Sequence, residues 1–312
     1  EAGEYYVEYR ITAPGYEEYS GRWHYTISEA YFEDEDIVID NNAEYKFDKE
    51  GQLPDITIPG GASIVFAFAA DATEWLSYNE MKENCKNVGE YKLFYKVSKD
   101  NYHDRRGSFN FTIDRAKMSD LGELIVDKTT FVYNGSIQLP HATFKFADGI
   151  TPINYKIYYR NPNSGSSPYM WCTIDYPRYL SVGLNVGKDL AVDIKAEPTD
   201  ENLNGNYEPV FIYNQLFDIT PASFVEGVDY TISGLTKPYI AHTYQFFGVT
   251  MNGYAQKGTS IKYSLTNDDS SEWSSDKYRL YMMDAGEYEV WIKLLNDNFV
   301  TLTQKVTFTI TS

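Results

Sequence analysis

The chain has 312 residues, which is enough for two or three domains that each bury a core. Aromatic residues make up 16% of it, 29 of them Tyr, and this composition favours pleated sheets over helices. The formal net charge of −18 repels phosphate backbones, and no apolar stretch reaches the roughly 18 residues of a membrane-spanning helix. We therefore expect neither nucleic-acid binding nor membrane insertion in this segment.

The first expected element is a β-hairpin within residues 1–30. Its opening phrase, "AGEY", contains Gly3, an aromatic follows at Tyr16, and Ile27 closes the second strand. The same two intervals recur without a gap after Gly89 and after Gly286. Their aromatic and closing Ile residues are Tyr102 with Ile113 and Phe299 with Ile310. Three copies that keep both intervals indicate one recurring unit.

Apolar and polar residues alternate with period two in all three hairpins, so each hairpin is expected to place one face on a core. The residues expected to face inward on the first strands are Tyr5, Val7, Tyr9 and Ile11, then Tyr91, Leu93, Tyr95 and Val97, and finally Tyr288, Val290, Ile292 and Leu294. Turn-forming residues separate the strands, as in "APG", "KDN" and "NDN".

A fourth copy of the hairpin is degraded. Its glycine is Gly187, its turn aromatic is Tyr207, and its closing residue is Ile219. The inward residues run one position late, which predicts a β-bulge or an inserted residue. These are Leu190, Val192 and Ile194.

The spacing of the closing Ile residues predicts an all-β chain of tandem immunoglobulin-like β-sandwich domains in an elongated array. The expected boundaries are 1–30 for the last hairpin of a truncated repeat, 31–116 for one repeat, 117–222 for a longer repeat with insertions, and 223–312 for another. A lone hairpin is marginally stable in water. Residues 1–30 are therefore either cut from a longer array, or complete the sheet of another chain, or pack on the next domain.

Two further marks precede the hairpins. A Trp lies upstream of three of the glycines, at Trp75, Trp171 and Trp273, and we expect Trp171 to belong to the core. The phrases "FDKEGQLP" and "YNGSIQLP" resemble each other, whereas the last unit has only a weak echo around Tyr239 and lacks "QLP". The strongest helix candidate is the short stretch "EWLSYNEMKENC".

These marks taken together resemble the MBG-type bacterial immunoglobulin-like repeat. One unit reads "YNGSIQLP", Trp171, Gly187 and "FDITPA", and another reads "VGEY", "DNY" and "FTIDRA". The resemblance implies a tandem module of secreted or cell-surface bacterial proteins, often adhesins. It brings no catalytic residues with it.

Candidate metal ligands are the consecutive acids Glu33, Asp34, Glu35 and Asp36. Carboxylates at a domain junction could hold Ca²⁺, which takes six to eight oxygen ligands. Because no glycine-punctuated calcium loop is present, a solvated acidic linker is the alternative. The four His residues, His24, His103, His141 and His242, show no metal-binding spacing, and Cys85 and Cys172 are expected to be buried, unpaired thiols.

Candidate ligand-binding residues are the aromatics of the long unit, namely Tyr158, Tyr159 and Tyr169, whose rings could stack on sugars. The alternative is that these rings pack within the sandwich or cover its edges.

The favoured function is a non-enzymatic structural or adhesive segment of a larger bacterial surface or secreted protein, acting as a rod-like spacer that displays a binding region. Its expected partners are neighbouring repeats of the same chain and a host glycan or surface protein. Two alternatives stay open: a glycan- or protein-binding module in the 117–222 unit, and an accessory region of a secreted enzyme.

Overall fold

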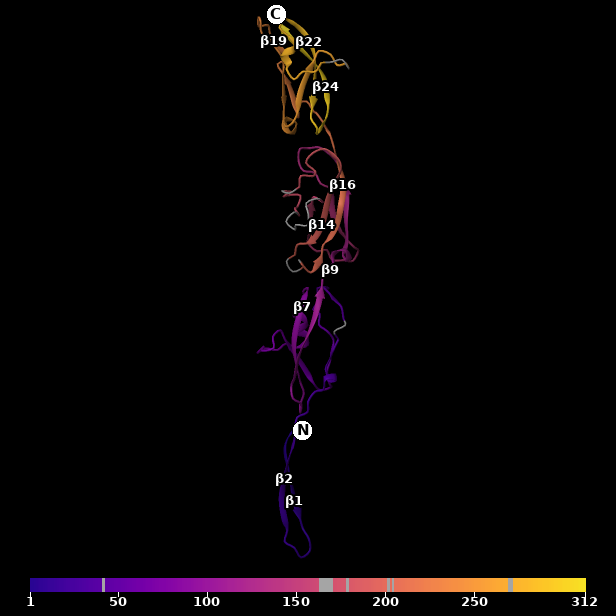
Figure 1. Cartoon of the computed structure of the whole chain (residues 1–312), viewed down its shortest axis with the longest axis vertical. Coiled ribbons are helices and arrows are strands. Elements are labelled where there is room, and N and C mark those ends of the chain that lie inside the picture. The colour runs from indigo at the N-terminus through magenta and orange to yellow at the C-terminus, as the bar shows by residue number, and fades with distance from the viewer. Residues whose placement is uncertain (41–42, 163–170, 178–179, 201–202, 204, 269–271) are drawn as a thin grey trace. The chain divides into compact units, whose positions relative to one another are not determined.

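The computed structural model describes residues 1–312 apart from 41–42, 163–170, 178–179, 201–202, 204 and 269–271 (Figure 1). Two compact units are present: Glu1–Asp120 with Pro198–Pro209, and Leu121–Glu197 with Val210–Ser312. The predicted fold class is confirmed, because both units consist of β-sheets that form tandem β-sandwiches. No helix in the described residues is both long and apolar enough to cross a bilayer.

The first unit begins with a two-stranded hairpin, followed by a four-stranded sheet in the order β4–β8–β7–β6. The hairpin consists of β1 (Gly3–Ile11) and β2 (Tyr19–Ile27), drawn in indigo in Figure 1. The sheet consists of β4 (Tyr45–Lys46), β6 (Ser63–Ala67), β7 (Gly89–Ser98) and β8 (Arg105–Asp114). Shorter elements are η1 (Asp34–Asp36), β3 (Val38–Ile39), which pairs with β5 (Ile56–Thr57), β9 (Ala116–Lys117), which pairs with β15 (Tyr207–Glu208), and η2 (Met118–Asp120).

The expected helix within residues 74–85 is present as α1 (Tyr78–Asn84). Its first turn is fixed by a reciprocal capping box: the Ser77 side chain accepts from the Glu80 N–H, and the Glu80 carboxylate accepts from the Ser77 N–H. Met81 is its fully buried residue, which anchors this short helix to the sandwich.

The second unit contains two four-stranded sheets with the same plan, β11–β16–β14–β13 and β19–β24–β22–β21. The first comprises β11 (Thr130–Val132), β13 (Tyr155–Arg160), β14 (Gly187–Pro198) and β16 (Val210–Thr220), accompanied by the pair β10 (Gly122–Lys128) and β12 (His141–Phe146). The second comprises β19 (Thr236–Pro238), β21 (Ser260–Ser264), β22 (Gly286–Leu295) and β24 (Leu302–Thr311), accompanied by the pair β18 (Tyr230–Ser233) and β20 (Gly248–Met251). Other elements among the described residues are β17 (Ala222–Ser223), which pairs with β23 (Phe299–Val300), η4 (Gly253–Gln256) and η5 (Lys277–Leu280).

Each opening glycine pairs with its closing Ile, as the sequence predicts. The pairs are Gly3–Ile27, Gly89–Ile113, Gly187–Ile219 and Gly286–Ile310. The copy after Gly187 has register shifts on both sides of Leu190–Val192, so the predicted irregularity is confirmed. Its inward face resumes at Val192, Ile194 and Ala196, which are fully buried.

In the hairpins β7–β8 and β22–β24 the cores lie where the alternation places them. The expectation is wrong for the first hairpin, because Val7, Tyr9 and Ile11 are exposed on a two-stranded sheet. Val290 and Ile292 join Phe247 and Phe308 in one buried cluster, and Leu294 joins Phe224 and Phe299 in a second. Fully burying one such side chain contributes about 1.5–3 kcal/mol relative to leaving it exposed.

A glutamine fixes the parallel edge strand in all three four-stranded sheets. The Nε2 atoms of Gln52, Gln138 and Gln245 donate to the carbonyls of Lys46, Val132 and Pro238 at 2.6, 3.0 and 2.7 Å. Their backbone N–H groups donate to the carbonyls of Cys85, Gly183 and Met282. The sheet of β19, β21, β22 and β24 therefore keeps this glutamine, although Phe246 and Phe247 replace the Leu-Pro that follows it in the other two sheets. The "QLP" sequence itself is absent there, as expected, but its glutamine and that residue's contacts are kept.

The opposite edge strand carries an aromatic that fills the core. Phe66, Tyr159 and Tyr263 are all buried, and each forms an antiparallel bridge to the residue that follows one of the three Trp residues. The bridge partners are Leu76, Cys172 and Ser274. This bridge explains why the three Trp residues recur at comparable places in the sequence.

Candidate functional site

The strongest recurring polar site is an asparagine in the hairpin turn. Asn101, Asn206 and Asn298 each precede the turn aromatic, and each accepts through Oδ1 from the backbone N–H just before an opening glycine. The donors are Ala2 at 2.6 Å, Val88 at 2.9 Å and Val186 at 2.8 Å. We call these three contacts the Asn joints.

The backbone of each Asn joint makes a second contact. The carbonyls of Asn101, Asn206 and Asn298 accept from the N–H groups of Ala30, Ala116 and Ala222 at 2.8, 3.1 and 3.1 Å. Each alanine follows the closing Ile of a hairpin by three residues and bridges in parallel to the turn aromatic. One turn thus binds both ends of another hairpin, through its first strand and through the residue after its second.

Two of the joints have an additional side-chain contact. The Nδ2 of Asn206 donates to Oδ1 of Asn87 at 2.9 Å, and the Nδ2 of Asn298 donates to Oδ1 of Asn185 at 3.2 Å. Asn87 and Asn185 both lie two residues before an opening glycine. The corresponding residue before Gly3 is Glu1, so the joint of Asn101 has no second amide there. Paired amides can satisfy each other without an added charge, which suits a half-buried contact.

The turn aromatics add apolar contact to the joints. The ring of Phe299 stacks on Phe224 at a centroid distance of 4.5 Å, and Tyr207 meets Phe47 edge-on at 5.4 Å. Tyr102 lies 5.0 Å from Phe32. Such pairs contribute about 0.5–1.5 kcal/mol beyond the area that they bury. The Asn joints therefore combine hydrogen bonds and ring packing, which can hold segments together but provide no group for covalent chemistry.

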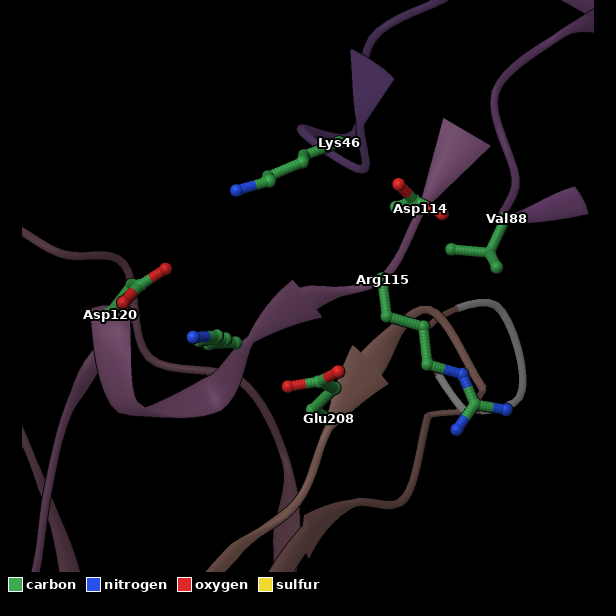
Figure 2. Close-up of a pocket in the computed structure, with 7 residues that line it drawn as sticks. Lys46, Val88, Asp114, Arg115, Asp120 and Glu208 are labelled. Atoms are coloured by element: carbon green, nitrogen blue, oxygen red, sulfur yellow. The ribbon is translucent and has the colours of Figure 1, made fainter. Parts of the chain in front are cut away.

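One hollow in the first unit has a volume of about 680 Å³. Figure 2 shows Lys46 and Asp114 on one side of it and Asp120 and Glu208 on the other. Cations and anions alternate around it, and its lining contains neither a His nor a Cys. The hollow therefore offers solvated charge of both signs and no nucleophile–base pair.

Histidines and cysteines show no catalytic arrangement in the described part of the chain. His103 pairs with Glu29 at 3.0 Å and His141 with Asp127 at 2.5 Å, both on the surface. Cys85 and Cys172 are buried and not joined by a disulfide, as expected, and burial raises the pKa of the Cys85 thiol to about 11. At neutral pH this thiol is protonated and therefore a poor nucleophile.

The acidic run Glu33–Asp36 forms the 3₁₀ turn η1 and is engaged with protein groups. Arg105 pairs with Asp34, and the Asp36 carboxylate accepts from the Glu33 N–H at 2.8 Å. Across the ranges that the structure describes, no three His, Cys, Asp or Glu side chains are grouped as metal ligands. Ca²⁺ binding by Glu33, Asp34, Glu35 and Asp36 stays a prediction.

The aromatics expected to bind a ligand separate in the structure. Tyr159 is 6% exposed and its hydroxyl donates to the Pro140 carbonyl at 2.9 Å, so the expectation that its ring stacks on a ligand is corrected. Neighbouring strand residues face opposite sides of a sheet, which leaves Tyr158 on the outer face. Its ring lies under the Lys195 ammonium at 4.6 Å, and burial followed by the nearby Glu197 charge raises its pKa. Tyr169 lies outside the described residues.

The three recurring Trp residues are half-buried under cations, so Trp171 is not the core residue that the sequence predicts. Lys96, Lys195 and Lys293 lie 5.9, 5.3 and 3.9 Å from the rings of Trp75, Trp171 and Trp273. These lysines are outward-facing residues of β7, β14 and β22. The Trp rings therefore cover the outer face of the sheet, where cation–π contacts stabilise them.

One outer face in the second unit carries additional rings. Phe211 and Tyr213 on β16 are exposed and stack with an interplanar angle of 7°, and Trp171 lies 5.9 Å from Phe211. Leu216 extends this apolar strip along the same strand. Period-two reading of "VFIYNQL" could have identified Phe211 and Tyr213 as outward-facing aromatics, whereas Leu216 reaches that face only through the register shift between β14 and β16.

No family model matches the chain, and no curated protein matches it. The resemblance to the MBG repeat therefore stays a prediction. Solved structures with tandem extracellular domains are similar at low identity. Zebrafish RET cadherin-like domains 1 to 4 are 10% identical, with a TM-score of 0.24, over 80% of this chain and 65% of that one. The protocadherin GammaB4 extracellular domain is 8% identical, with a TM-score of 0.22, over 99% of this chain and 56% of that one.

Drosophila N-cadherin EC1-4 is 10% identical, with a TM-score of 0.23, over 99% of this chain and 83% of that one. This chain thus spans less than two thirds of the RET and protocadherin chains that it matches. Likeness at these values carries no conclusion about activity or partners, so the functional argument below rests on the residues of this chain.

Proposed function

We propose that this chain is a non-enzymatic structural or adhesive segment of a bacterial secreted or cell-surface protein, an MBG-like array that acts as a spacer. The observation that carries the proposal is the Asn joint, which recurs three times. Each time the Asn Oδ1 accepts from the backbone N–H before an opening glycine, and the Asn carbonyl accepts from an alanine N–H. A repeated hydrogen-bonded contact between one turn and another hairpin is a device for holding repeats in order.

The domain boundaries expected from the sequence, near residues 30, 116 and 222, fit this proposal. Ala30, Ala116 and Ala222 lie at these positions and receive the turn backbone of each joint. With these expected boundaries, each joint would lie between two repeats and take its partners from neighbouring repeats of the same chain, which supports the proposal.

Amide hydrogen exchange measures how much a joint protects its donor amide. In the Asn298→Ala variant the Val186 N–H loses its acceptor, which is worth about 1 kcal/mol, or about a fivefold loss of protection. NMR relaxation of the same variant should show the segments on either side of the joint reorienting more independently. Asn110→Ala is the control, because Asn110 is exposed on β8 outside any joint. Unchanged protection of the Val186 amide and unchanged relaxation in Asn298→Ala would contradict the proposal.

A second candidate function, ligand binding by the 117–222 unit, is favoured by the strip of Phe211, Tyr213 and Leu216. Exposed stacked rings beside charged groups are the kind of surface on which sugars or protein partners dock. A glycan array probed with the whole chain would support it if saturable binding disappears in Tyr213→Ala and survives in Tyr176→Ala, since Tyr176 is exposed elsewhere in the unit. Binding that neither change affects would place the ligand elsewhere.

A further inference from the structure

The hairpin β1–β2 has the same cross-strand pairs as β7–β8. Tyr5 faces Tyr25, Val7 faces Trp23 and Tyr9 faces Gly21. The corresponding pairs are Tyr91–Phe111, Leu93–Phe109 and Tyr95–Gly107.

Both hairpins also lay a tyrosine ring over a glycine at the same place. A Cβ added to Gly21 would lie 2.6 Å from the Tyr9 ring, and one added to Gly107 would lie 2.4 Å from the Tyr95 ring. This face of β1–β2 is therefore shaped as half of a sandwich.

Burial distinguishes the two hairpins. Leu93 and Val97 are 0% exposed, whereas their counterparts Val7 and Ile11 are 47% and 59% exposed, and Trp23 is 65% exposed. A contiguous apolar surface of this kind indicates a contact with something else.

The other face of β1–β2 carries charged residues and suits contact with solvent. Arg22 pairs with Glu8 at 2.6 Å and lies 4.1 Å from the Tyr6 ring, and Arg10 pairs with Glu18 at 3.5 Å. A sheet with one charged and one apolar face is built to pack on one side only. The missing contact is therefore on the face of Val7, Ile11 and Trp23.

In the related hairpins, an antiparallel strand extends such a face at the edge of the first strand. In β6, Ile64 pairs with Val97 and Phe66 with Tyr95; in β21, Ile261 pairs with Leu294 and Tyr263 with Ile292. Both strands read Ser-Ile-x-aromatic-small, as "SIVFA" and "SIKYS", and both run antiparallel to the first strand of their hairpin. The aromatic of this pattern reaches the second strand as well, because the Phe66 ring meets Phe109 edge-on at 6.4 Å.

We propose that β1 is an acceptor for a partner strand of the pattern Ser-Ile-x-aromatic-small. The strand adds antiparallel to β1 with its Ile opposite Ile11 and its aromatic opposite Tyr9, and the aromatic ring meets Trp23. The free backbone edge of β1 provides the hydrogen bonds, and the exposed face provides specificity for alternate side chains. A second copy of this chain does not offer such a strand among its described residues, because β6 and β21 are already paired in their own sheets.

A tethered strand tests the proposal without depending on the affinity of a free peptide. The probe is the full chain with a second copy of residues 61–69 fused ahead of Glu1 through a flexible linker. A linker of about 15 Gly and Ser residues reaches about 20 Å, which matches the roughly seven strand residues between Glu8 and Glu1. The matched control is the same fusion with Ile64→Asp and Phe66→Asp in the added copy only.

We expect amide exchange of residues 3–11 to slow at least tenfold in the fusion relative to the control, and an Ile11→Asp change in the hairpin to abolish that difference. Equal exchange in the fusion and its control would overturn the proposal. So would protection that survives Ile11→Asp, or protection in the unfused chain that rises with protein concentration, because the last result would make a second copy the occupant.

Discussion

The hairpins β1–β2 and β22–β24 have nearly the same opening phrase and opposite surroundings. Val7 and Val290 occupy the same position after their opening glycines, yet Val7 is half-exposed and Val290 is completely buried. Around β22–β24 the parallel strand β19 and the antiparallel strand β21 complete the sheet, whereas β1–β2 forms a two-stranded sheet. The period-two pattern thus determines which side chains share a face, and the segments packed around that face determine whether it is buried.

The largest expected difference between these hairpins is in the cost of shortening one inward residue. Leu294→Ala should destabilise its sandwich by about 2–5 kcal/mol, because it leaves a cavity in a packed core. Ile11→Ala, at the equivalent position, should cost less than about 0.5 kcal/mol, because that side chain is already in water. Denaturant unfolding with site-resolved amide exchange measures both. Equal costs would mean that β1 is covered in solution.

A glycine pair sharpens the comparison. Gly107→Ala forces a methyl group into the Tyr95 ring, whose strand is held between β6 and β8. We expect a cost of about 1–3 kcal/mol from overpacking. Gly21→Ala meets Tyr9 at nearly the same distance, but Tyr9 is exposed and its ring can rotate away, so the cost should be within about 0.5 kcal/mol. A large cost at Gly21 would show that Tyr9 is held in place.

The third comparison concerns the parallel edge strand. In the first unit β4 pairs with β8 and is fixed by Gln52, whereas no parallel strand pairs with β2. Gln52→Ala removes the donor to the Lys46 carbonyl at 2.6 Å and to Asp48 at 2.9 Å. Loss of these bonds should destabilise the sandwich that contains β4 and β8 by about 1–2 kcal/mol and expose the β4 amides to exchange. Asn110→Ala in the same sandwich is the control. Unchanged exchange in β4 would show that pairing with β8 alone holds the strand.

The strands were predictable from the sequence where a recurring glycine or isoleucine marks the end of a hairpin. Gly and Ile mark both ends of each hairpin, so strand, register and face follow from period two, even across the bulge after Gly187. The fate of Trp171 was not predictable in this way, because it lies outside a regular strand and alternation assigns it no face. The structure places it against Arg160 and Lys195 instead of the core.

The Asn joints were missed for a related reason. The Asn in "DNY" and "DNF" is adequately explained as a turn former, and its Oδ1 partner comes from another hairpin about 100 residues away. Only the tertiary fold brings Asn298 to Val186. The available signal was positional: Asn101 and Asn298 lie at the same distance from Gly89 and Gly286, whereas Gly15 stands at that position after Gly3. Gly15 lacks the amide that an Asn joint requires.

The smallest expected effect concerns the cations over the Trp rings. Lys293 lies 3.9 Å from the Trp273 ring, so Lys293→Met should cost about 0.5–1 kcal/mol, as expected for an exposed cation–π contact. Arg10 is at the equivalent position of β1 and pairs with Glu18 on the surface, so Arg10→Met should have an effect near zero. Exchange of the β22 and β1 amides measures the two effects. Because Met keeps an unbranched apolar side chain, a loss confined to Lys293 isolates the charge over the ring. No loss at Lys293 would assign the stabilisation to packing of the aliphatic stem, which Met retains.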